Sequence, residues 1–369
     1  MVGVVMRGGQ SAPLAALGVP DDVALAPFAA CYRVADFAYA SLRNSGIHVT
    51  RPEVPGTPRP GARLLAALRS VARLPRIDRN EPVVVLVADH ILDADLRAAL
   101  AYHDAAGADL GLLCVPAGST PPDACLLDVD VRGTVRGASA ASAEAAALSL
   151  TWTGDLIVRA GSLTRLLATL ASCSLATDAV HIAALARAHR VVAHDVLDTR
   201  PGRRRPYWHE PSSIEAYYGA QMDLCTDSPR LDLYDPAWPV LGTADGLPPA
   251  KVVSGEAAHA GQALDSLLGD GAVIRGGSVI RSVVGRGVLV EVGAEIEDSL
   301  LLDRCRIGRG ARVRRAVVGA GAVVGDGEQI GYDDEACAAA VTERRPSGLT
   351  LVLARNAPRL SVAAPRGRG

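Results

Sequence analysis

Two stretches of the sequence contain residue types suited to phosphate binding. "VVMRGGQSAPLAAL" (4–17) runs from an apolar strand into Gly8 and Gly9, and glycines in such a turn let backbone amides approach a phosphate closely. The residues that follow are small and uncharged, so this loop supplies no cation of its own. "RPGRRRP" (200–206) contains Arg200, Arg203, Arg204 and Arg205, which either offer bidentate phosphate contacts or form a solvated loop.

Several other chemistries lack the residues they need. The seven Cys contain no CxxC pair and the eight His are dispersed, so the sequence favours reduced thiols and disfavours a zinc site. No GxSxG motif occurs, and no Cys lies near a His in the sequence, so nucleophilic catalysis has no support.

The composition is that of a globular protein. Of 369 residues, 49% are apolar and 21% charged, and the net charge of −2 argues against a nucleic-acid or anionic membrane partner. The N-terminal "MVGVVM" is too short for a secretory or membrane-spanning segment, which predicts a cytoplasmic protein. Lys251 is the only lysine, and Arg does not replace Lys at sites that need a compact point charge.

The C-terminal third contains an internal repeat of 17 residues, within which aliphatic residues step by six, six and five. Such hexads indicate short strands joined by turns, three to a coil, with the aliphatic side chains stacked inward. The pattern predicts a parallel β-helix, and it resembles the left-handed kind. No His lies in 267–334, which disfavours the acyltransferases that share this fold. The predicted inward residues are Leu267, Val273, Val279, Val284, Val290, Ile296, Leu301, Ile307, Val313, Val318, Val324 and Ile330.

The first two-thirds of the chain alternates apolar strands with helical stretches. This predicts a Rossmann-like α/β/α domain with a mostly parallel sheet, whose ligands lie at the carboxyl ends of strands. We place the α/β domain in 1–245 and the β-helix domain in 246–369.

Longer motifs closely resemble one known family. "YWHEPSSIEAYYGAQMDLC", "LDLYDPAWPV" and "LPPAKVV" are similar to "YWRDVGTIEAYYEANMDLL", "LDLYNPxWPI" and "LPPAKFV" of the glucose-1-phosphate adenylyltransferases, the ADP-glucose pyrophosphorylases of glycogen and starch synthesis. "FAACYRVADFAYASLRNSGI" and "VVVLVADHI" resemble two further family segments. The resemblance covers residues 1 to about 353, and it implies a nucleotidyltransferase α/β domain followed by a left-handed β-helix.

The resemblance also implies where the family's phosphate-binding residues are lost. Of the loop "AGGRGTRLxPLT", Gly8 and Gly9 remain, while Ser11 and Pro13 take the places of its later Gly and its Arg. Val23 stands where the family has the Lys of "AKP". The acidic-lysine pair of "FxEKP" has no counterpart either.

Other family positions are retained in part. Gly154 is kept from the sugar-facing motif, with Trp152 where a small hydroxyl residue belongs. Asp89 and Glu210 match the two carboxylates that hold Mg²⁺, with Glu in place of the second Asp. For Asp89 the alternative is a cap on the following turn or helix. Arg33 and Arg43 remain from the region where the family binds sugar-phosphate effectors.

These substitutions predict a catalytically silent or weak member of the family, acting as a regulatory or structural subunit. The resemblance implies a tetramer, formed by this chain with itself or with a catalytically intact relative. The alternative is an active enzyme that makes ADP-glucose with Asp89, Glu210 and arginines from elsewhere. A third hypothesis is a binding module for sugar phosphates or nucleotide sugars.

Overall fold

The structure is a computed structural model. It describes residues 1–9, 12–20, 22–50, 62–74, 77–117, 124–140, 150–173, 177–196, 200, 206–242, 246–255, 260–332 and 342–353. Ser11, Arg203, Arg204 and Arg205, which the sequence analysis named, lie outside these described residues.

The chain forms two compact units that interleave along the sequence. Unit 1 comprises 1–9, 34–210 and 233–241, and unit 2 comprises 10–33, 211–232 and 242–369. The short segments 10–33 and 211–232 therefore group with the β-helix, although they lie within the predicted domain 1–245. The predicted domain limits themselves stay a prediction.

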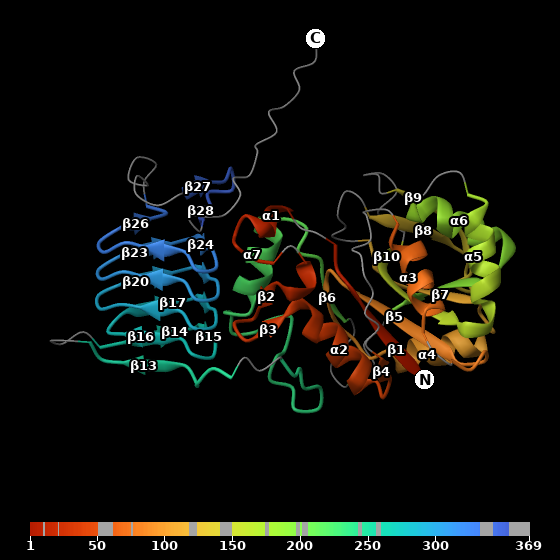
Figure 1. Cartoon of the computed structure of the whole chain (residues 1–369), viewed down its shortest axis with the longest axis horizontal. Coiled ribbons are helices and arrows are strands. Elements are labelled where there is room, and N and C mark those ends of the chain that lie inside the picture. The colour runs from red at the N-terminus through yellow and green to blue at the C-terminus, as the bar shows by residue number, and fades with distance from the viewer. Residues whose placement is uncertain are drawn as a thin grey trace, which may run out of the picture. The chain divides into compact units, whose positions relative to one another are not determined.

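Unit 1 is built on an eight-stranded sheet in the order β11-β7-β10-β5-β1-β4, with the β8–β9 hairpin attached to β10. β1 pairs in parallel with β4 and β5, and β11 with β7, whereas β10 runs antiparallel between β5 and β7. The mostly parallel α/β fold predicted from the sequence is thus confirmed (Figure 1). The strands are β1 (Val2–Arg7), β4 (His48–Thr50), β5 (Pro82–Ala88), β7 (Leu110–Pro116), β8 (Cys125–Val129), β9 (Val135–Ala140), β10 (Leu150–Arg159) and β11 (Val191–Asp195), with β6 (Ile91–Asp93) pairing β12 (Tyr207–His209) apart from this sheet.

Helices cover both faces of this sheet because successive strand residues point to opposite sides. Val4 of β1 joins a buried cluster with side chains of α3, α5 and α6. A Cβ on its neighbour Gly3 would instead lie 2.8 Å from a methyl carbon of Leu42 in α2, which covers the opposite face. The helices are α2 (Val34–Asn44), α3 (Arg63–Ala72), α4 (Arg97–Ala105), α5 (Leu163–Ala171) and α6 (Asp178–Ala188).

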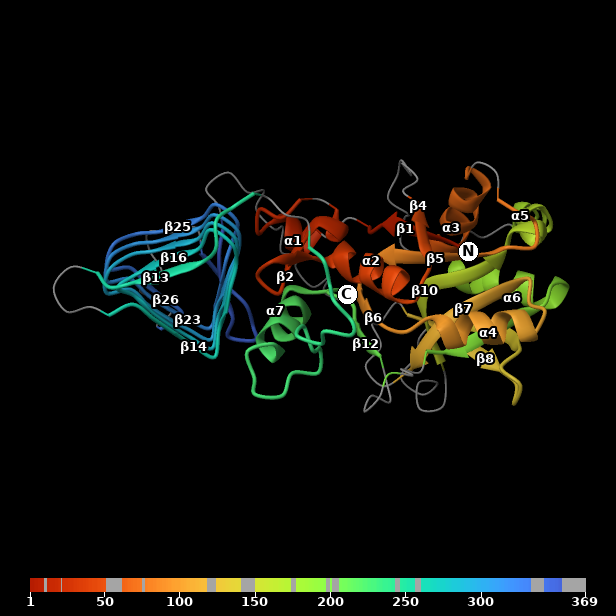
Figure 2. The ribbon, with the colours of Figure 1, turned by 90° about the horizontal axis from the view of Figure 1, so that it is seen from below.

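Unit 2 contains the predicted parallel β-helix, whose coils lie over one another when viewed along the stack (Figure 2). Neighbouring strands of successive coils pair in parallel within the same sheet, and the exception is β27, which pairs antiparallel with β28. The three sheets are β13 (Lys251–Val253), β16 (Val273–Arg275), β19 (Leu289–Val290), β22 (Arg306–Ile307), β25 (Val323–Val324); β14 (Gln262–Leu264), β17 (Ser278–Ile280), β20 (Glu295–Glu297), β23 (Arg312–Arg314), β26 (Gln329–Ile330); and β15 (Leu267–Leu268), β18 (Val283–Val284), β21 (Leu300–Leu301), β24 (Ala316–Val318), β28 (Thr350–Val352), β27 (Thr342–Arg344). Unit 2 also contains α1 (Ala12–Ala15), β2 (Pro27–Phe28), β3 (Tyr32–Arg33) and α7 (Ile214–Asp223).

The predicted inward residues are correct from Val279 onward and wrong at two positions in the first coil. Leu268 pairs with Val284, and Ile274 pairs with Val290, so these two residues take the inward places predicted for Leu267 and Val273. The physical reason is one residue fewer in the turn between Ile274 and Val279, which a constant period cannot reveal.

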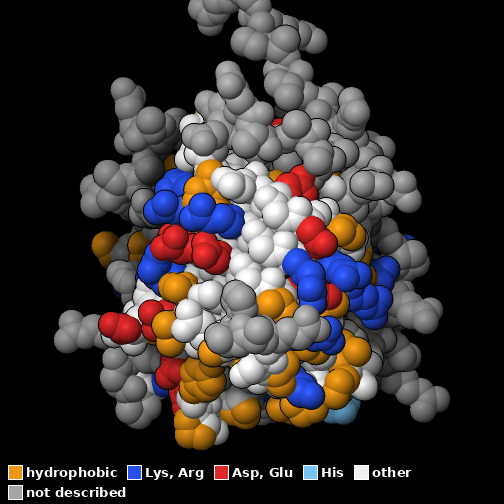
Figure 3. Space-filling view, turned by 90° about the vertical axis from the view of Figure 1, so that its left-hand side faces the viewer, with side chains coloured by type: hydrophobic (Ala, Val, Ile, Leu, Met, Phe, Trp, Pro, Cys, Tyr) orange, Lys and Arg blue, Asp and Glu red, His pale blue; other side chains and the backbone are white. Residues whose placement is uncertain are grey.

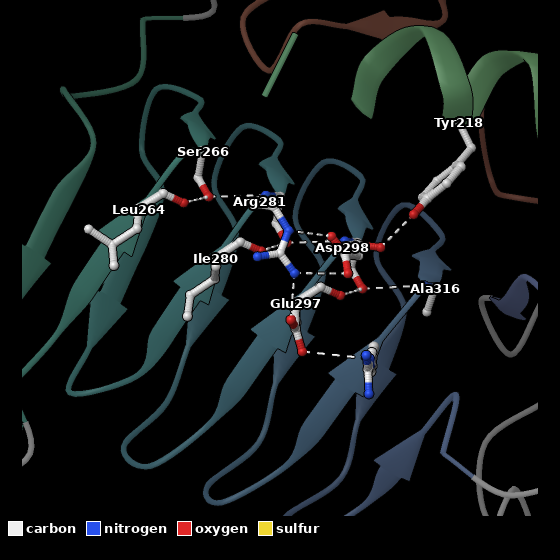
Figure 4. A network of polar contacts seen from close by, with 11 residues as sticks. Tyr218, Leu264, Ser266, Ile280, Arg281, Glu297, Asp298 and Ala316 are labelled. Atoms are coloured by element: carbon white, nitrogen blue, oxygen red, sulfur yellow. Dashed lines mark hydrogen bonds and ion pairs between the residues drawn. The ribbon is translucent and has the colours of Figure 1, made fainter. Parts of the chain in front are cut away.

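One corner of the β-helix is held by a serine ladder. The Oγ of Ser266 accepts a hydrogen bond from the amide of Ser282 at 3.0 Å, Ser282 does the same for Ser299 at 3.1 Å, and Ser299 for Ala316 at 3.2 Å (Figure 4). Beside the ladder, Arg281 pairs with Glu297 and Asp298 of the next coil. Figure 3 shows basic and acidic side chains in adjacent groups on the face that it displays.

Candidate functional site

The candidate site lies where the central strand β5 ends. Asp89 follows this strand directly and is buried, at 7% exposure. Gly8 follows the parallel strand β1, and a Cβ there would lie only 2.6 Å from the carbonyl oxygen of Ala88. The backbones therefore approach too closely for any side chain at position 8, which explains why a glycine is present there.

Arg63, which the sequence analysis did not single out, joins the two predicted metal ligands. Its Nη2 lies 3.1 Å from Oδ2 of Asp89 and 2.9 Å from Oε1 of Glu210, which follows β12. Arg63 is the first residue of α3 and is otherwise unremarkable in the amphipathic segment "GARLLAAL". The structure thus brings Asp89 and Glu210 together as predicted, but with a guanidinium between them.

His90 extends this cluster further into the domain. Its Nδ1 lies 2.8 Å from Oδ1 of Asp89, and its Nε2 lies 2.9 Å from Oδ2 of Asp155 on β10. Burial by itself lowers the pKa of His90, but the carboxylates of Asp155 and Asp89 outweigh it and raise that pKa to about 10. His90 is therefore an imidazolium at neutral pH.

Asp155 is fixed from several sides. Its Oδ1 accepts a hydrogen bond from the amide of Val87 at 2.8 Å, and its Oδ2 accepts one from Oγ1 of Thr153 at 2.9 Å. The indole N–H of Trp152 donates to the backbone carbonyl of Asp155 at 2.8 Å. Trp152, which the sequence comparison placed where a small hydroxyl residue belongs, is thus a buried support for this network.

The pKa values of the two carboxylates shift in opposite directions, although Arg63 lowers both. Burial disfavours the ionised form of Asp89, but Arg63 and His90 hold its pKa below the usual range. Burial raises the pKa of Glu210; Arg63 opposes this shift, and the nearby Asp89 carboxylate adds to it. The two carboxylates therefore repel each other, and Arg63 compensates for their charge.

Mg²⁺ does not fit these carboxylates while Arg63 is in place. Mg²⁺ takes oxygen ligands at about 2.1 Å in near-octahedral geometry. Both oxygens of Asp89 are already engaged, one by His90 and one by Arg63, and Oε1 of Glu210 is engaged by Arg63. In the described part of the chain, no group of three or more His, Cys, Asp or Glu residues is arranged to hold a metal ion.

Three further predicted site residues belong to unit 1, and of these Gly154 lies beside Arg63. Gly154 has a φ of +100°, which favours glycine, and a Cβ there would lie 3.7 Å from Cδ and Nη1 of Arg63. Gly9 follows Gly8 and is partly buried. Arg43 lies on α2 and donates a hydrogen bond to the backbone carbonyl of Pro239 at 3.0 Å.

Arg200 belongs to a separate buried cluster. Its guanidinium donates to Oδ1 and Oδ2 of Asp93 at 3.2 and 3.0 Å and lies 4.5 Å from the ring centre of Trp238. Arg200 is therefore a structural residue, neither a solvated side chain nor a phosphate ligand. The other three arginines of that loop lie outside the described residues.

Unit 2 contains a pocket of about 490 Å³ with a basic wall. Arg33, Arg286 and Arg304 line it together with Asp303, whose Oδ2 lies 2.9 Å from Nη1 of Arg33. Three arginines against one aspartate give the wall a net positive charge. Val23, at the position of the family lysine, is a buried residue of the same unit and adds no charge.

The fold and site together define a class. A mixed α/β sheet with an acidic cluster at the end of its central strand, in one chain with a hexapeptide β-helix, is the architecture of the sugar-phosphate nucleotidyltransferases. The family model described as "GlmU-like, C-terminal hexapeptide" matches residues 248–352.

Full-length relatives narrow the class to one family. The chain is 29% identical to the glucose-1-phosphate adenylyltransferase of Frankia casuarinae, over 95% of this chain and 97% of that protein. It is 31% identical to that of Paramagnetospirillum magneticum, over 75% of this chain and 67% of the relative. A shorter match to that of Rhodopirellula baltica reaches 40% identity over 41% of this chain and 34% of the relative. The chain belongs to the glucose-1-phosphate adenylyltransferase family.

The helices of the described residues can be compared with the length and hydropathy that a membrane-spanning helix needs. None of their helices is both long enough and apolar enough to cross a bilayer.

Proposed function

We propose that this chain is a catalytically silent or very weak member of its family that acts as a regulatory or structural subunit. The observation that carries the proposal is the salt bridge of Arg63 to both Asp89 and Glu210. Adenylyl transfer in this class needs a cation that is available to the phosphates and stabilises their developing charge. Arg63 is held by protein carboxylates instead.

The charge balance of the site supports this proposal against the alternative of an active enzyme that uses arginines from elsewhere. Arg63 does arrive from another segment, as that alternative requires. However, the cluster contains three carboxylates, Asp89, Asp155 and Glu210, against the two cations Arg63 and His90. A triphosphate approaching it meets no excess positive charge, and like charges in a desolvated site repel strongly.

The basic pocket of unit 2 supports the regulatory part of the proposal. Arg33, retained from the family's effector region, lies there with Arg286 and Arg304, and guanidinium groups bind phosphates through paired hydrogen bonds. We infer that the pocket binds a sugar-phosphate effector. Arg43 is not among the residues that line this pocket.

The first coil of the β-helix supports assembly into an oligomer. Among the described strands, β13, β14 and β15 each pair on one edge only, with β16, β17 and β18. Val252 and Leu264 on this coil are 41% and 53% exposed. Unpaired strand edges next to exposed aliphatic side chains favour contact with another chain. We propose a tetramer of this chain with itself or with a catalytically intact relative.

The test is to purify the chain alone and measure ADP-glucose formation from ATP and glucose 1-phosphate with Mg²⁺, beside an intact family member as the positive control. We expect no turnover above the background. The chain is then mixed with the intact relative, and co-elution with altered effector response is expected. Turnover of the chain alone at about 1 per second or faster, the usual enzyme range, would refute the proposal.

A further inference from the structure

We propose that Arg63 is a built-in cation that occupies the place of a divalent metal ion between Asp89 and Glu210, and that removing its guanidinium opens a divalent-cation site there. The inference deepens the proposed function and rests on it in one respect: these carboxylates no longer serve turnover.

The geometry of a single atom carries the inference. Nη2 of Arg63 lies within 3.1 Å of Oδ2 of Asp89 and within 2.9 Å of Oε1 of Glu210. A cation at the position of this nitrogen therefore faces one oxygen of each carboxylate, which is the arrangement that a bridging metal ion needs. Because a metal binds carboxylate oxygens at about 2.0 to 2.6 Å, the side chains need only small movements inward to hold one.

Arg63 is covalently attached to the chain, and its surroundings position the guanidinium between the two carboxylates. Its side chain is only 24% exposed, and its Cδ and Nη1 lie beside the backbone of Gly154. A Cβ at Gly154 would lie 3.7 Å from both atoms, which is van der Waals contact, so residue 154 packs directly against the Arg63 side chain. A cation attached to the chain does not exchange with solvent, whereas a metal ion does.

The repulsion between the carboxylates explains why a replacement cation would bind. Asp89 is buried and the Glu210 side chain is 15% exposed, and each carboxylate destabilises the ionised form of the other when no cation lies between them. Deleting the guanidinium removes the cation that the two acidic groups share, while His90 still pairs with Asp89. A divalent ion is the small species that best neutralises two carboxylates at once.

The experiment compares Arg63→Met, which keeps the length of the side chain and removes its charge, with Arg63→Lys, which keeps a cation. Arg69→Met is the matched control, since Arg69 is an exposed residue of the same helix. Arg63→Met combined with Asp89→Asn tests whether the predicted ligand is used. The probe is Mn²⁺ alone, followed by electron paramagnetic resonance and by calorimetry, with no nucleotide present.

We expect Arg63→Met to bind one Mn²⁺ at least tenfold more tightly than the wild type, Arg63→Lys and Arg69→Met do. The additional Asp89→Asn substitution should abolish this gain. Mn²⁺ should also raise the unfolding temperature of Arg63→Met and leave that of the wild type unchanged, because a ligand that binds only the folded state stabilises it. If Arg63→Met folds only when Mn²⁺ is present, that recovery supports the inference too.

Three results would overturn the inference. One is a folded Arg63→Met chain with no gain in Mn²⁺ affinity, and another is an unfolded one that Mn²⁺ does not recover. The third is Asp89-dependent Mn²⁺ binding by the wild type that equals that of Arg63→Met. Turnover by the wild-type chain would instead refute the proposed function and leave the Mn²⁺ titration to decide this inference separately.

Discussion

Asp178 caps the helix that carries Arg63. Its Oδ2 accepts a hydrogen bond from the amide of Arg63 at 3.2 Å, and its Oδ1 accepts one from the amide of Leu64 at 2.9 Å. The first amides of a helix have no partner within it, and Ala62, which precedes α3, has no side chain that can cap them. Asp178, 115 residues along the chain from Arg63, supplies the cap and thereby fixes where the guanidinium emerges.

The cap predicts a measurable loss of stability. Asp178→Ala removes both acceptors, and we expect the free energy of unfolding to fall by about 2 kcal/mol, the upper range for a helix cap. Asp178→Asn retains one oxygen acceptor and should lose about half as much. Urea titration of the three proteins measures the difference. Equal stability of wild type and Asp178→Ala would show that α3 does not need this cap.

Arg63 should contribute more to stability than Arg69, the other arginine of α3. Arg63→Met leaves Asp89 and Glu210 without their shared cation, and breaking this largely buried ion pair should cost up to about 3 kcal/mol. Arg69→Met, the same change at an exposed position of the same helix, should cost less than about 0.5 kcal/mol. Thermal and urea unfolding without divalent metal distinguish them. Similar losses in both variants would contradict the assigned role of Arg63.

Much of this architecture could be predicted from the sequence because it depends on local periodicity. The spacing of aliphatic residues determines the β-helix, and alternating apolar segments determine the α/β sheet. The meeting of Asp89 and Glu210 followed from motifs that resemble a family. In the first coil, by contrast, a turn shortened by one residue moved Leu268 and Ile274 into the inward positions.

Arg63 could not be predicted, because nothing local distinguishes it. It reaches Asp89 and Glu210 through a long side chain, and these residues lie 26 and 147 positions away in the sequence. The pairing of His90 with Asp155 is equally non-local, at 65 positions. Such contacts depend on how the helices and strands pack in three dimensions, so a periodic pattern contains no signal for them.

The serine ladder predicts that removing one of its hydroxyl groups lowers the free energy of unfolding. Ser299→Ala removes the acceptor for the amide of Ala316 and the donor to the carbonyl of Glu297, and Ser299 is fully buried. An unsatisfied buried amide costs about 1 to 3 kcal/mol, so unfolding should become easier by that amount. Ser278→Ala, at a partly exposed β-helix position, is the control, with a change below about 0.5 kcal/mol. Equal effects would mean that the ladder adds nothing.

The basic pocket predicts selective loss of anion binding. Arg304→Ala removes one of the three arginines that line it, and a hydrogen bond to a charged group contributes about 1.5 kcal/mol or more, or roughly tenfold in affinity. Arg312→Ala, on the outer face beside Glu295, should leave binding unchanged. Calorimetry with a panel of sugar mono- and bisphosphates, and inorganic phosphate for comparison, measures both. A panel that shows no binding to the wild type would refute an effector role for this pocket.

Stability at acid pH should depend on His103. This residue of α4 is buried, and burial together with the nearby guanidinium of Arg159 lowers its pKa to about 4. Neither of its ring nitrogens has a hydrogen-bond partner in the described part of the chain. The folded state therefore binds the proton less tightly than the unfolded state, in which the pKa is about 6.5.

The sign of the effect follows from this difference. The contribution of neutral His103 to stability is complete above pH 6.5 and is lost as the pH falls from 6.5 toward 4. By pH 5 the loss in the free energy of unfolding amounts to about 2 kcal/mol. His103→Leu removes the titrating group. When the pH is lowered from 7.5 to 5, the free energy of unfolding measured with urea should therefore fall by about 2 kcal/mol less in the variant than in the wild type. His194, whose pKa burial also lowers to about 4, contributes equally to both proteins and cancels in the comparison. Parallel pH profiles for wild type and variant would mean that the folded protein admits the proton at His103 as readily as the unfolded chain does.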